Sequence, residues 1–519
     1  MVEYKVLITT SGLGSRLGNL TNHTNKCLVR VTDKPAISHI IESYPKDTEF
    51  VITLGYYGGY VKQFLELTYP DHNFDFISVD KYKGEGSSLG YSILQCKDII
   101  DKPFIFHASD TILTNTKLPP LDHNWMVGSF KEDASHYRTM RVKGKNIITV
   151  NDKGEINYDS IYVGISGVMD YKKFFTILDH LVSTSDEDLS DVHVTLEMLK
   201  ETEFKHFFVK HENWFDVGNV SELNRTRGSF ESNIEVLDKT DESIFLFDDF
   251  VVKFFANEKI NSDRVLRGRE LYPLTPIIIN HTNNFYKYEK VSGNLFSKSV
   301  NAGSFKKFLQ WANDSLWIKR EDKTIKDKCY KFYIDKTMSR IGEYLKNVSD
   351  TETETVINGE TIPPINELVD NLDKDWLTDG IPTQFHGDFI LDNVIETENG
   401  FSLIDWRQDF GGDTLVGDVY YDLAKLNHNL TVNHDIVSRG LFDKDKNNCY
   451  ILTNSTLNEC KVILKDFCVK NGYDHVKVEM LTSLIWINMS PLHEYPFNDF
   501  LFNFGKYNLH IKLKEWKQL

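Results

Sequence analysis

The sequence predicts two folded domains in succession: an α/β domain with a mostly parallel sheet, then a bilobal α+β domain. The 519 residues exceed what one ordinary hydrophobic core organises, so two or three domains are expected. From residue 4 to about residue 228, β-rich runs alternate with amphipathic helical segments, which is typical of a parallel sheet. Beyond about residue 240, two strand-like runs precede long helical stretches. We therefore place the domains at residues 1–230 and 231–519.

Composition and charge exclude several classes of protein. Apolar residues make up 41% and charged residues 26%, as in globular proteins. No apolar run approaches the roughly 18 residues of a membrane span, and the first residues lack the pattern of a signal peptide. The six cysteines show no CxxC spacing and indicate reduced thiols. A net charge of −17 without a basic block argues against nucleic acid polymers or membranes as partners, so we expect a cytoplasmic protein of undetermined oligomeric state.

The strongest chemical signal in the second domain is the segment His386-Gly387-Asp388, with Asn393 and Asp405 after it. Transfer of a phosphoryl group from ATP needs a carboxylate near the acceptor hydroxyl, and an amide oxygen plus a second carboxylate to hold Mg²⁺. Asp388 suits the first role, and Asn393 and Asp405 suit the other two. Their order and spacing are those of a kinase catalytic loop and its metal-binding aspartate. An acidic turn beside a buried hairpin is the structural alternative.

Residues for ATP itself are expected upstream of this loop. Lys253 stands inside the apolar run VVKFF and suits the lysine that holds the α- and β-phosphates of ATP. An exposed strand lysine is the alternative. Glu270, in the following helical stretch, is the candidate partner of that lysine, although Arg267 and Arg269 leave the register open. Glu289, in YEKVSG, marks the segment whose backbone would contact adenine.

The first domain opens with a β-rich run that ends in closely spaced glycines. Gly12 and Gly14 allow backbone N–H groups to approach an anion without a Cβ clash, and Arg16 adds a charge for phosphate oxygens. A simple turn or a dinucleotide site would give a similar pattern. Leu17, however, occupies the third glycine position of the dinucleotide fingerprint. Lys26 follows ten residues after Arg16.

Two aspartates end later strands of the first domain. Asp110 closes the apolar run FIFHASD, and Asp216 follows the aromatic pair in WFDVGN. In nucleotidyl transfer an acceptor phosphate attacks the α-phosphorus and pyrophosphate leaves, which needs Mg²⁺ on carboxylates and cations on the departing charge. Asp110 and Asp216 are therefore candidate metal ligands, and Arg16 and Lys26 are candidate phosphate clamps. Either aspartate alone could cap a helix, but the four in this order favour a site.

These motifs carry two resemblances. The HGDxxxxN and ID motifs of residues 240–510 resemble the aminoglycoside phosphotransferase and choline kinase families. The string SGLGSRLGNLTNHTNKCLVRVTDKP within residues 3–228 resembles nucleotidyltransferases that join a nucleoside triphosphate to a sugar phosphate or phosphocholine, with Asn25 in place of their proline. The resemblances imply a Rossmann-like first domain and a kinase-like second domain. They also place Ser87, in EGSSLG, in a small-residue loop against the nucleobase.

The kinase resemblance also implies supporting roles near the catalytic loop. The families carry a GDxxxDLA helix that braces this loop, so Asp418 or Asp422 is expected to orient His386 or its backbone. In the tail SLIWINM, Trp486 and Met489 lie at helical spacing. That spacing fits core packing, and in the related kinases this end of the chain covers the acceptor.

Together the two resemblances imply a bifunctional enzyme. The second domain would phosphorylate a small hydroxyl compound with ATP. The first would transfer a nucleotidyl group, with CTP favoured, to the resulting phosphate and give a CDP-activated alcohol, polyol or sugar plus pyrophosphate for a surface polysaccharide. Mg²⁺ is the expected metal. The alternatives are a sugar kinase joined to a sugar-1-phosphate uridylyl- or guanylyltransferase, a regulatory or scaffold protein with degenerate enzyme domains, and an antibiotic-modifying kinase.

Overall fold

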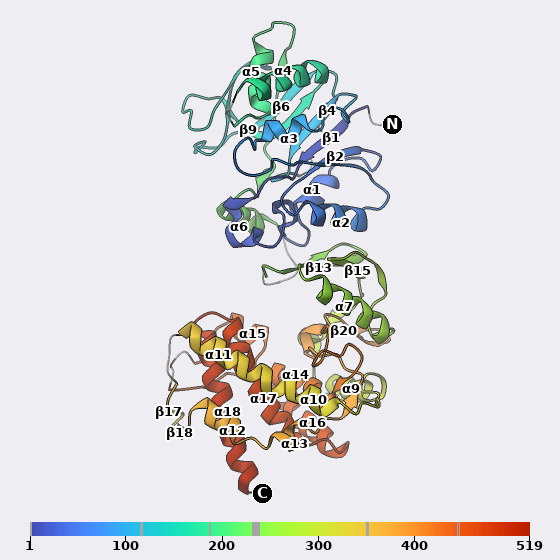
Figure 1. Cartoon of the computed structure of the whole chain (residues 1–519), viewed down its shortest axis with the longest axis vertical. Coiled ribbons are helices and arrows are strands. Elements are labelled where there is room, and N and C mark those ends of the chain that lie inside the picture. The colour runs from blue at the N-terminus through green and yellow to red at the C-terminus, as the bar shows by residue number, and fades with distance from the viewer. Residues whose placement is uncertain are drawn as a thin grey trace. The chain divides into compact units, whose positions relative to one another are not determined.

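The computed structural model describes residues 3–114, 118–185, 188–230, 239–348, 352–443, 445 and 447–518. The chain forms two compact units, whose helices and strands are labelled in Figure 1. The N-terminal unit consists of Met1–Asn261 and Ile279–Tyr288, and the C-terminal unit consists of Ser262–Ile278 and Glu289–Leu519. The predicted boundary between residues 230 and 231 adjoins residues 231–238, which lie outside the described residues, and it stays a prediction.

A sheet of nine described strands forms the centre of the N-terminal unit, in the order β3-β2-β1-β4-β9-β6-β10-β8-β7. The strands are β1 (Lys5–Thr9), β2 (Glu49–Leu54), β3 (Asn73–Ser78), β4 (Phe104–Ala108), β6 (Asn124–Ser129), β7 (Thr139–Lys143), β8 (Asn146–Asn151), β9 (Ser160–Val168) and β10 (His206–Lys210). β1 pairs in parallel with β2 and β4, β2 with β3, and β6 with β10, whereas β9 runs antiparallel between β4 and β6. Most strands therefore share one direction, which confirms the predicted Rossmann-like α/β fold.

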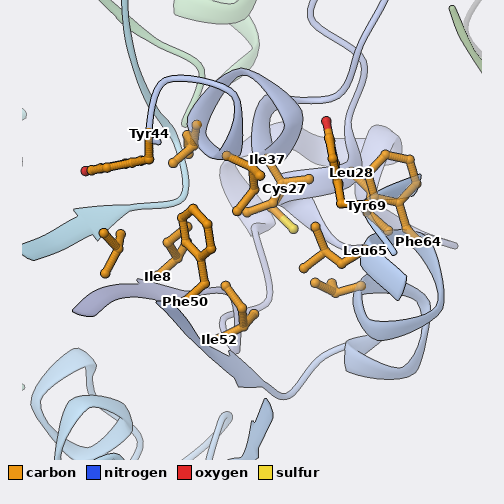
Figure 2. Close-up of a cluster of buried hydrophobic side chains, with 14 of the residues drawn as sticks. Ile8, Cys27, Leu28, Ile37, Tyr44, Phe50, Ile52, Phe64, Leu65 and Tyr69 are labelled. Atoms are coloured by element: carbon orange, nitrogen blue, oxygen red, sulfur yellow. The ribbon is translucent and has the colours of Figure 1, made fainter. Parts of the chain in front are cut away.

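Helices cover both faces of this sheet. The α-helices of this part of the unit are α1 (Ala36–Ile41), α2 (Gly58–Thr68), α3 (Leu89–Leu94), α4 (Tyr171–Thr184), α5 (Asp191–Leu199) and α6 (Val220–Ser229), and the first five pack on the sheet. On β1, Ile8 belongs to one buried cluster with Phe64 of α2 (Figure 2), while its neighbour Leu7 belongs to another with Phe174 of α4. Because adjacent strand residues point to opposite faces, the sheet is buried on both sides.

A four-stranded sheet follows the predicted boundary, and it packs on α2 within the N-terminal unit. Its strands are β12 (Glu242–Leu246), β13 (Phe250–Phe255), β14 (Ile278–His281) and β15 (Phe285–Glu289), in the order β12-β13-β15-β14. The ring centroids of Phe64 and Phe245 lie 5.3 Å apart. Gln63 exchanges two hydrogen bonds with Asn284, one to its side chain at 3.2 Å and one from its backbone N–H at 3.0 Å. The N-terminal core thus extends into strands that were predicted to open the second domain.

Helices dominate the C-terminal unit. They are α8 (Phe296–Ser299), α9 (Ala302–Ser315), α10 (Ile325–Tyr330), η3 (Lys331–Asp335), α11 (Lys336–Val348), α12 (Ile365–Asp370), α13 (Lys374–Thr378), α14 (Val419–Asn429), α15 (His434–Ser438), α16 (Ser455–Lys470), α17 (His475–Met489) and α18 (Phe497–Gln518), together with most of α7 (Glu258–Leu271). Short strands form three small sheets: β16 (Asn294–Leu295) with β20 (Val394–Thr397) and β21 (Gly400–Leu403), β17 (Thr355–Ile357) with β18 (Glu360–Ile362), and β19 (Pro382–Thr383) with β22 (Gly417–Asp418). The predicted α+β fold is confirmed.

Local sequence accounts for the helices that frame the catalytic segment. The Asp418 side chain caps α14 by accepting the backbone N–H of Tyr420 at 3.2 Å. The apolar residues of α17 are spread around the helix, which is buried along most of its length, as expected of a central helix. The candidate catalytic segment, residues 385–393, connects β19 to β20. Across the described ranges, no helix combines the length and apolar character needed to cross a membrane.

Candidate active sites in the two units

In the N-terminal unit, the predicted charged residues gather beyond the carboxyl ends of β1 and β4. Arg16 lies on the short 3₁₀ helix η1 (Ser15–Thr21) after β1, and Lys26 begins the next one, η2 (Lys26–Leu28). Asp110 follows β4, and Asp216 ends β11 (Trp214–Asp216). β11 pairs with β5 (Thr111–Leu113), and the backbone N–H of Val217 donates to the Asp110 carbonyl oxygen at 2.9 Å. This pairing brings the two aspartates together from positions more than a hundred residues apart.

Cations hold Asp110 in its ionised form. Lys26 Nζ lies 2.9 Å and Arg16 Nη2 lies 3.9 Å from Asp110 Oδ2. Burial acts to raise the pKa of Asp110, but Lys26 and Arg16 outweigh it and lower the pKa below its ordinary value. The two predicted phosphate clamps thus lie at the predicted metal ligand.

The pKa of Asp216 shifts in the opposite direction, to a value above its ordinary one. Burial and the neighbouring charge of Asp110 raise the pKa of Asp216, while hydrogen bonds from the Tyr137 hydroxyl and the Gly218 N–H oppose this rise. Those bonds measure 2.6 Å to Oδ2 and 2.7 Å to Oδ1. Lys131 in turn donates to the Tyr137 hydroxyl at 2.9 Å. The carboxylates of Asp110 and Asp216 repel each other, and a bound cation would relieve this repulsion. They suit Mg²⁺, which takes one or two carboxylates and completes its shell with water and phosphate oxygens.

Gly218 is a residue of this candidate site that sequence reasoning missed. A Cβ atom at this position would lie 3.1 Å from both Asp110 Oδ2 and Asp216 Oδ1 and 3.3 Å from Arg16 Nη2. The glycine therefore leaves room between the carboxylates and the arginine. The only sign of this role in the sequence was the position of the glycine, two residues after the candidate metal ligand Asp216. Tyr137 was also missed, since it comes from an irregular segment before β7 with no motif around it.

The glycine loop adopts the conformation that its sequence requires at Gly14. This residue has φ +68°, and a Cβ there would meet Lys26 Cβ at 2.7 Å. Gly12 has open space around it. Ser87 hydrogen bonds to the Gly84 carbonyl within its own loop at 2.6 Å. The helix after that loop is joined to the glycine loop by the hydroxyl pair Ser11–Ser92 at 2.9 Å.

Asn25, which stands where the related sequences have proline, holds the turn through side-chain hydrogen bonds. Its Nδ2 donates to the carbonyl oxygens of Thr10 at 2.7 Å and Tyr56 at 2.6 Å, and its Oδ1 accepts the Cys27 N–H at 3.0 Å. The side chain is fully buried. The hydrogen bonds of Asn25 therefore anchor the segment that carries Lys26 to the end of β1. The related sequences have the rigid ring of proline at this position.

In the C-terminal unit, the catalytic segment brings its three predicted residues together. Asn393 Nδ2 donates to the Asp388 carbonyl oxygen at 2.9 Å and to Asp388 Oδ2 at 3.1 Å. The hairpin of β20 and β21 returns the chain so that the Ile404 N–H donates to the Asn393 carbonyl oxygen at 2.9 Å, and Asp405 follows with φ +54°. A non-glycine residue in the left-handed region is uncommon and is often found at functional sites. The oxygen donors of Asn393 and Asp405 fit Mg²⁺.

The backbone of this segment is braced from α14, as the resemblance implied. Asp422 accepts the N–H groups of His386 and Gly387, each at 2.7 Å, and burial raises its pKa to about 6. Asp418 instead caps α14 and accepts the Tyr333 hydroxyl at 2.8 Å. His386 is fully buried, and burial lowers its pKa to about 4, so the ring is neutral. It accepts the Asp388 N–H, which leaves its other nitrogen to donate to a carbonyl oxygen.

Three cations of this site were not predicted. Lys425 Nζ lies 2.7 Å from Asp388 Oδ1, and Arg264 Nη1 lies 2.5 Å from Asp405 Oδ1. Arg267 is 2% exposed and donates to the Phe385 and Thr414 carbonyl oxygens, and burial lowers its pKa to about 9. Each comes from α7 or α14, far along the chain from its partner. Sequence spacing offered no signal for these contacts.

The predicted ATP residues are placed as follows. Lys253 is buried in β13 of the N-terminal unit, opposite Ile244 of β12. Glu270 is exposed near the end of α7, and Glu289 is exposed at the end of β15, where its N–H donates to the Ile277 carbonyl oxygen at 3.1 Å. Their roles toward ATP stay predictions.

Comparison with known proteins supports both resemblances. Residues 338–440 match the phosphotransferase enzyme family, APH. The bifunctional protein GlmU of Methanococcus vannielii is 23% identical over 235 residues, which cover 44% of this chain and 55% of that protein. The choline-phosphate cytidylyltransferase of Streptococcus pneumoniae is 25% identical over 134 residues, which cover 25% of this chain and 56% of that protein. The chain thus spans just over half the length of these curated relatives.

Among solved structures, the CTP:phosphocholine cytidylyltransferase from Streptococcus pneumoniae is 20% identical, with a TM-score of 0.38, and the match covers 44% of this chain and 99% of that one. The sequence comparisons confirm both predicted resemblances. The chain joins an N-terminal region similar to nucleotidyltransferases to a C-terminal region that matches the phosphotransferase enzyme family.

Proposed function

We propose that the chain is a bifunctional enzyme that phosphorylates a small hydroxyl compound with ATP and then transfers a nucleotidyl group to the product. The observation that carries this proposal is that each unit holds the charged constellation its own reaction needs. Asp110 and Asp216 meet Arg16 and Lys26 in one unit. In the other, the Asp388 carboxylate lies beside Asn393, and Asp405 follows the adjoining hairpin.

In the phosphotransfer step, Asp388 acts as the base. Lys425 and the segment's own hydrogen bonds keep its carboxylate ionised and fixed. The acceptor hydroxyl gives its proton to Asp388 while its oxygen bonds to the γ-phosphorus, and the bond to the β-phosphate oxygen breaks to release ADP. Mg²⁺ on Asn393 and Asp405 would neutralise phosphate charge. The neutral His386 and the buried Asp422 hold the loop in shape.

In the nucleotidyl step, Arg16 and Lys26 provide positive charge. A phosphate oxygen of the phosphomonoester attacks the α-phosphorus of the second nucleotide, and the bond to the pyrophosphate oxygen breaks. Arg16 and Lys26 move from Asp110 to the phosphates and stabilise the charge on the departing pyrophosphate. Gly14 and Gly12 leave the backbone accessible to phosphate oxygens. Mg²⁺ on Asp110 and Asp216 would neutralise the triphosphate.

CTP is the nucleotide we propose for this step. The choline-phosphate cytidylyltransferase of Streptococcus pneumoniae, which is 25% identical over its matched part, supports a cytidylyl group. The product would be a CDP-activated alcohol, polyol or sugar, made in the cytoplasm for a surface polysaccharide. A sugar kinase joined to a sugar-1-phosphate uridylyl- or guanylyltransferase is the second candidate, because Arg16, Lys26, Asp110 and Asp216 suit the transfer of any nucleotidyl group.

Phosphorus NMR of the purified chain tests the proposal. The protein is incubated with Mg-ATP, one of four second nucleotides, and a panel of hydroxyl compounds. A diphosphate diester should form only when ATP, one nucleotide and one acceptor are all present. Asp388→Ala should abolish ADP formation and spare nucleotidyl transfer to a supplied phosphomonoester, and Asp110→Ala should do the reverse. Loss of both activities in either folded variant contradicts the two-site assignment.

A further inference from the structure

A cavity of about 160 Å³ lies inside the C-terminal unit, and one of its lining residues, Lys425, contacts the proposed base Asp388. η3 and α11 form one wall, α14 a second, and the apolar residues Leu481, Leu484 and Ile485 of α17 a third. Lys425 lines the cavity and contacts Asp388 Oδ1, whereas Oδ2 of the same carboxylate faces Asn393. The carboxylate therefore has one oxygen at the predicted metal ligand and one at Lys425, a residue of the cavity wall. An acceptor bound in this cavity would bring its hydroxyl to that second oxygen.

The charged residues that line this cavity are all positive. Among the described residues that line it, four are cations and none is a carboxylate; the cations are Lys336, Arg340, Arg407 and Lys425. Two of them have anionic partners outside the lining. Lys425 pairs with Asp388 at 2.7 Å, and Arg340 pairs with Glu343 at 2.7 Å, one turn along its own helix.

The other two cations have no such partner among the described ion pairs. The Arg407 Nε donates to a backbone carbonyl oxygen, that of Asp409, at 3.1 Å. Lys336 Nζ lies 4.1 Å from the centre of the Phe332 ring, and burial together with the charges of Arg407 and Lys425 holds the pKa of Lys336 well below its ordinary value. Bringing like charges into a half-buried cavity is unfavourable unless an anion compensates them.

The same contacts disfavour a cationic acceptor such as an amino alcohol. Quaternary ammonium groups are bound by the faces of aromatic rings. The Phe332 ring already has Lys336 at 4.1 Å and Arg407 at 5.0 Å from its centre. A further cation at this ring would meet the positive charges of Lys336 and Arg407, which have no carboxylate partner among the described ion pairs.

From this geometry, and resting on the proposed phosphotransfer activity, we propose that the acceptor carries an anionic group beside its hydroxyl. Lys336 and Arg407 bind that carboxylate or phosphate, and the hydroxyl lies at Asp388. The substrate class is then a hydroxy acid, a sugar acid, or a polyol or sugar phosphate. Its phosphorylation gives a product with two anionic groups, one of which is the phosphomonoester used in the nucleotidyl step.

Matched sets of acceptors test this inference with the full-length chain. ADP release from Mg-ATP is measured with glycerol, glycerate and glycerol phosphate, with glucose, gluconate and glucose phosphate, and with choline and ethanolamine. Ligand-observed NMR measures the binding of the same compounds. We expect the anionic members to exceed their neutral counterparts in kcat/KM and in affinity by about 10- to 100-fold, as for charge-assisted hydrogen bonds. The carboxylate and phosphate members show which anion is bound.

Lys336→Met and Arg407→Met should each raise the KM for the anionic acceptor about tenfold or more, while the KM for ATP stays the same. Lys331→Met is the matched control, because it removes one positive charge from the same helical segment at an exposed position outside the cavity. A preference for choline or a neutral polyol overturns the inference and leaves the kinase assignment standing. Anion binding that is equal in the wild type and both variants also overturns it. ADP release that no acceptor stimulates overturns the kinase assignment, and the inference with it.

Discussion

Replacing Lys425 with methionine should move the acidic limb of the phosphotransfer pH profile to higher pH. Burial acts to raise the pKa of Asp388, and the Lys425 ammonium at 2.7 Å overcomes this and lowers it. Methionine keeps the apolar length of lysine without the charge. The pKa of Asp388 therefore rises in the variant, and the base is protonated at pH values where it is ionised in the wild type.

The size of the effect follows from the exposure of the pair. A hydrogen bond to a charged group contributes about 1.5–3 kcal/mol. The lower end applies because 36% of the Asp388 side chain is exposed, although only 13% of Lys425 is. A change of about 1.4 kcal/mol corresponds to about a tenfold change in rate. We therefore expect about a tenfold loss of kcat on the acidic limb and a partial recovery as the pH rises.

The free energy of unfolding should also fall in the Lys425→Met variant. A carboxylate whose folded-state pKa is depressed stabilises the fold above its unfolded pKa, and this contribution is lost as the pH falls through the folded pKa. The Lys425→Met variant should thus be about 1.5 kcal/mol less stable than the wild type at neutral pH, and the difference should shrink in acid.

The assay is kcat for ADP release at saturating acceptor from about pH 3.5 to about pH 8, with urea unfolding at both ends of this range, because the pKa of Asp388 in the wild type lies below its ordinary value. Lys331→Met serves as the control for a change in net charge alone, since this lysine is exposed. An acidic limb that stays in place in the Lys425 variant would falsify the assignment of Asp388 as a base tuned by Lys425. An equal loss at every pH would show that Lys425 only positions substrate.

Three further substitutions test the N-terminal unit. Gly218→Ala should reduce nucleotidyl turnover by about 100-fold, since a methyl group within 3.1 Å of both aspartates displaces oxygen ligands; unaltered turnover would exclude them as the metal site. Asn25→Ala should cost about 2–4 kcal/mol in urea unfolding, because two buried carbonyl groups lose their donor, and a cost near zero would contradict its anchoring role. Phe64→Ala should cost about 3–5 kcal/mol. It should also raise hydrogen exchange in β12 and β15, whose Phe245 and Phe285 contact that ring, and exchange confined to α2 would argue against a shared core.

The sequence predicted that Asp388, Asn393 and Asp405 lie close together, because the geometry of this segment is local. Asp388, Asn393 and Asp405 lie within one loop and one hairpin, so their offsets alone place them near each other. Lys425 and Arg264 could not be found in this way. They reach the site from separate helices, and a lysine or arginine on a helix gives no sign of the carboxylate it will meet.

The strands after residue 239 show a second limit of sequence reasoning. A polar composition indicates that a segment is exposed to solvent, but it does not indicate which core receives the strands that follow. The strands after residue 239 place Phe245 and Phe285 against Phe64 of α2, through contacts between residues far apart in the chain. Hydrophobic alternation correctly predicts such strands. It cannot choose between two cores, because burial on either satisfies the same pattern.

Net charge illustrates why the substrate must be inferred from the site. The chain carries a formal charge of −17, which taken alone favours a cationic substrate. At about 0.15 M salt the Debye length is about 8 Å, so most surface charges act weakly on a half-buried cavity. Lys336 and Arg407 lie in the cavity wall, where screening is weak. Their charges therefore decide which acceptor binds, and the sign they favour is opposite to the one that composition favours.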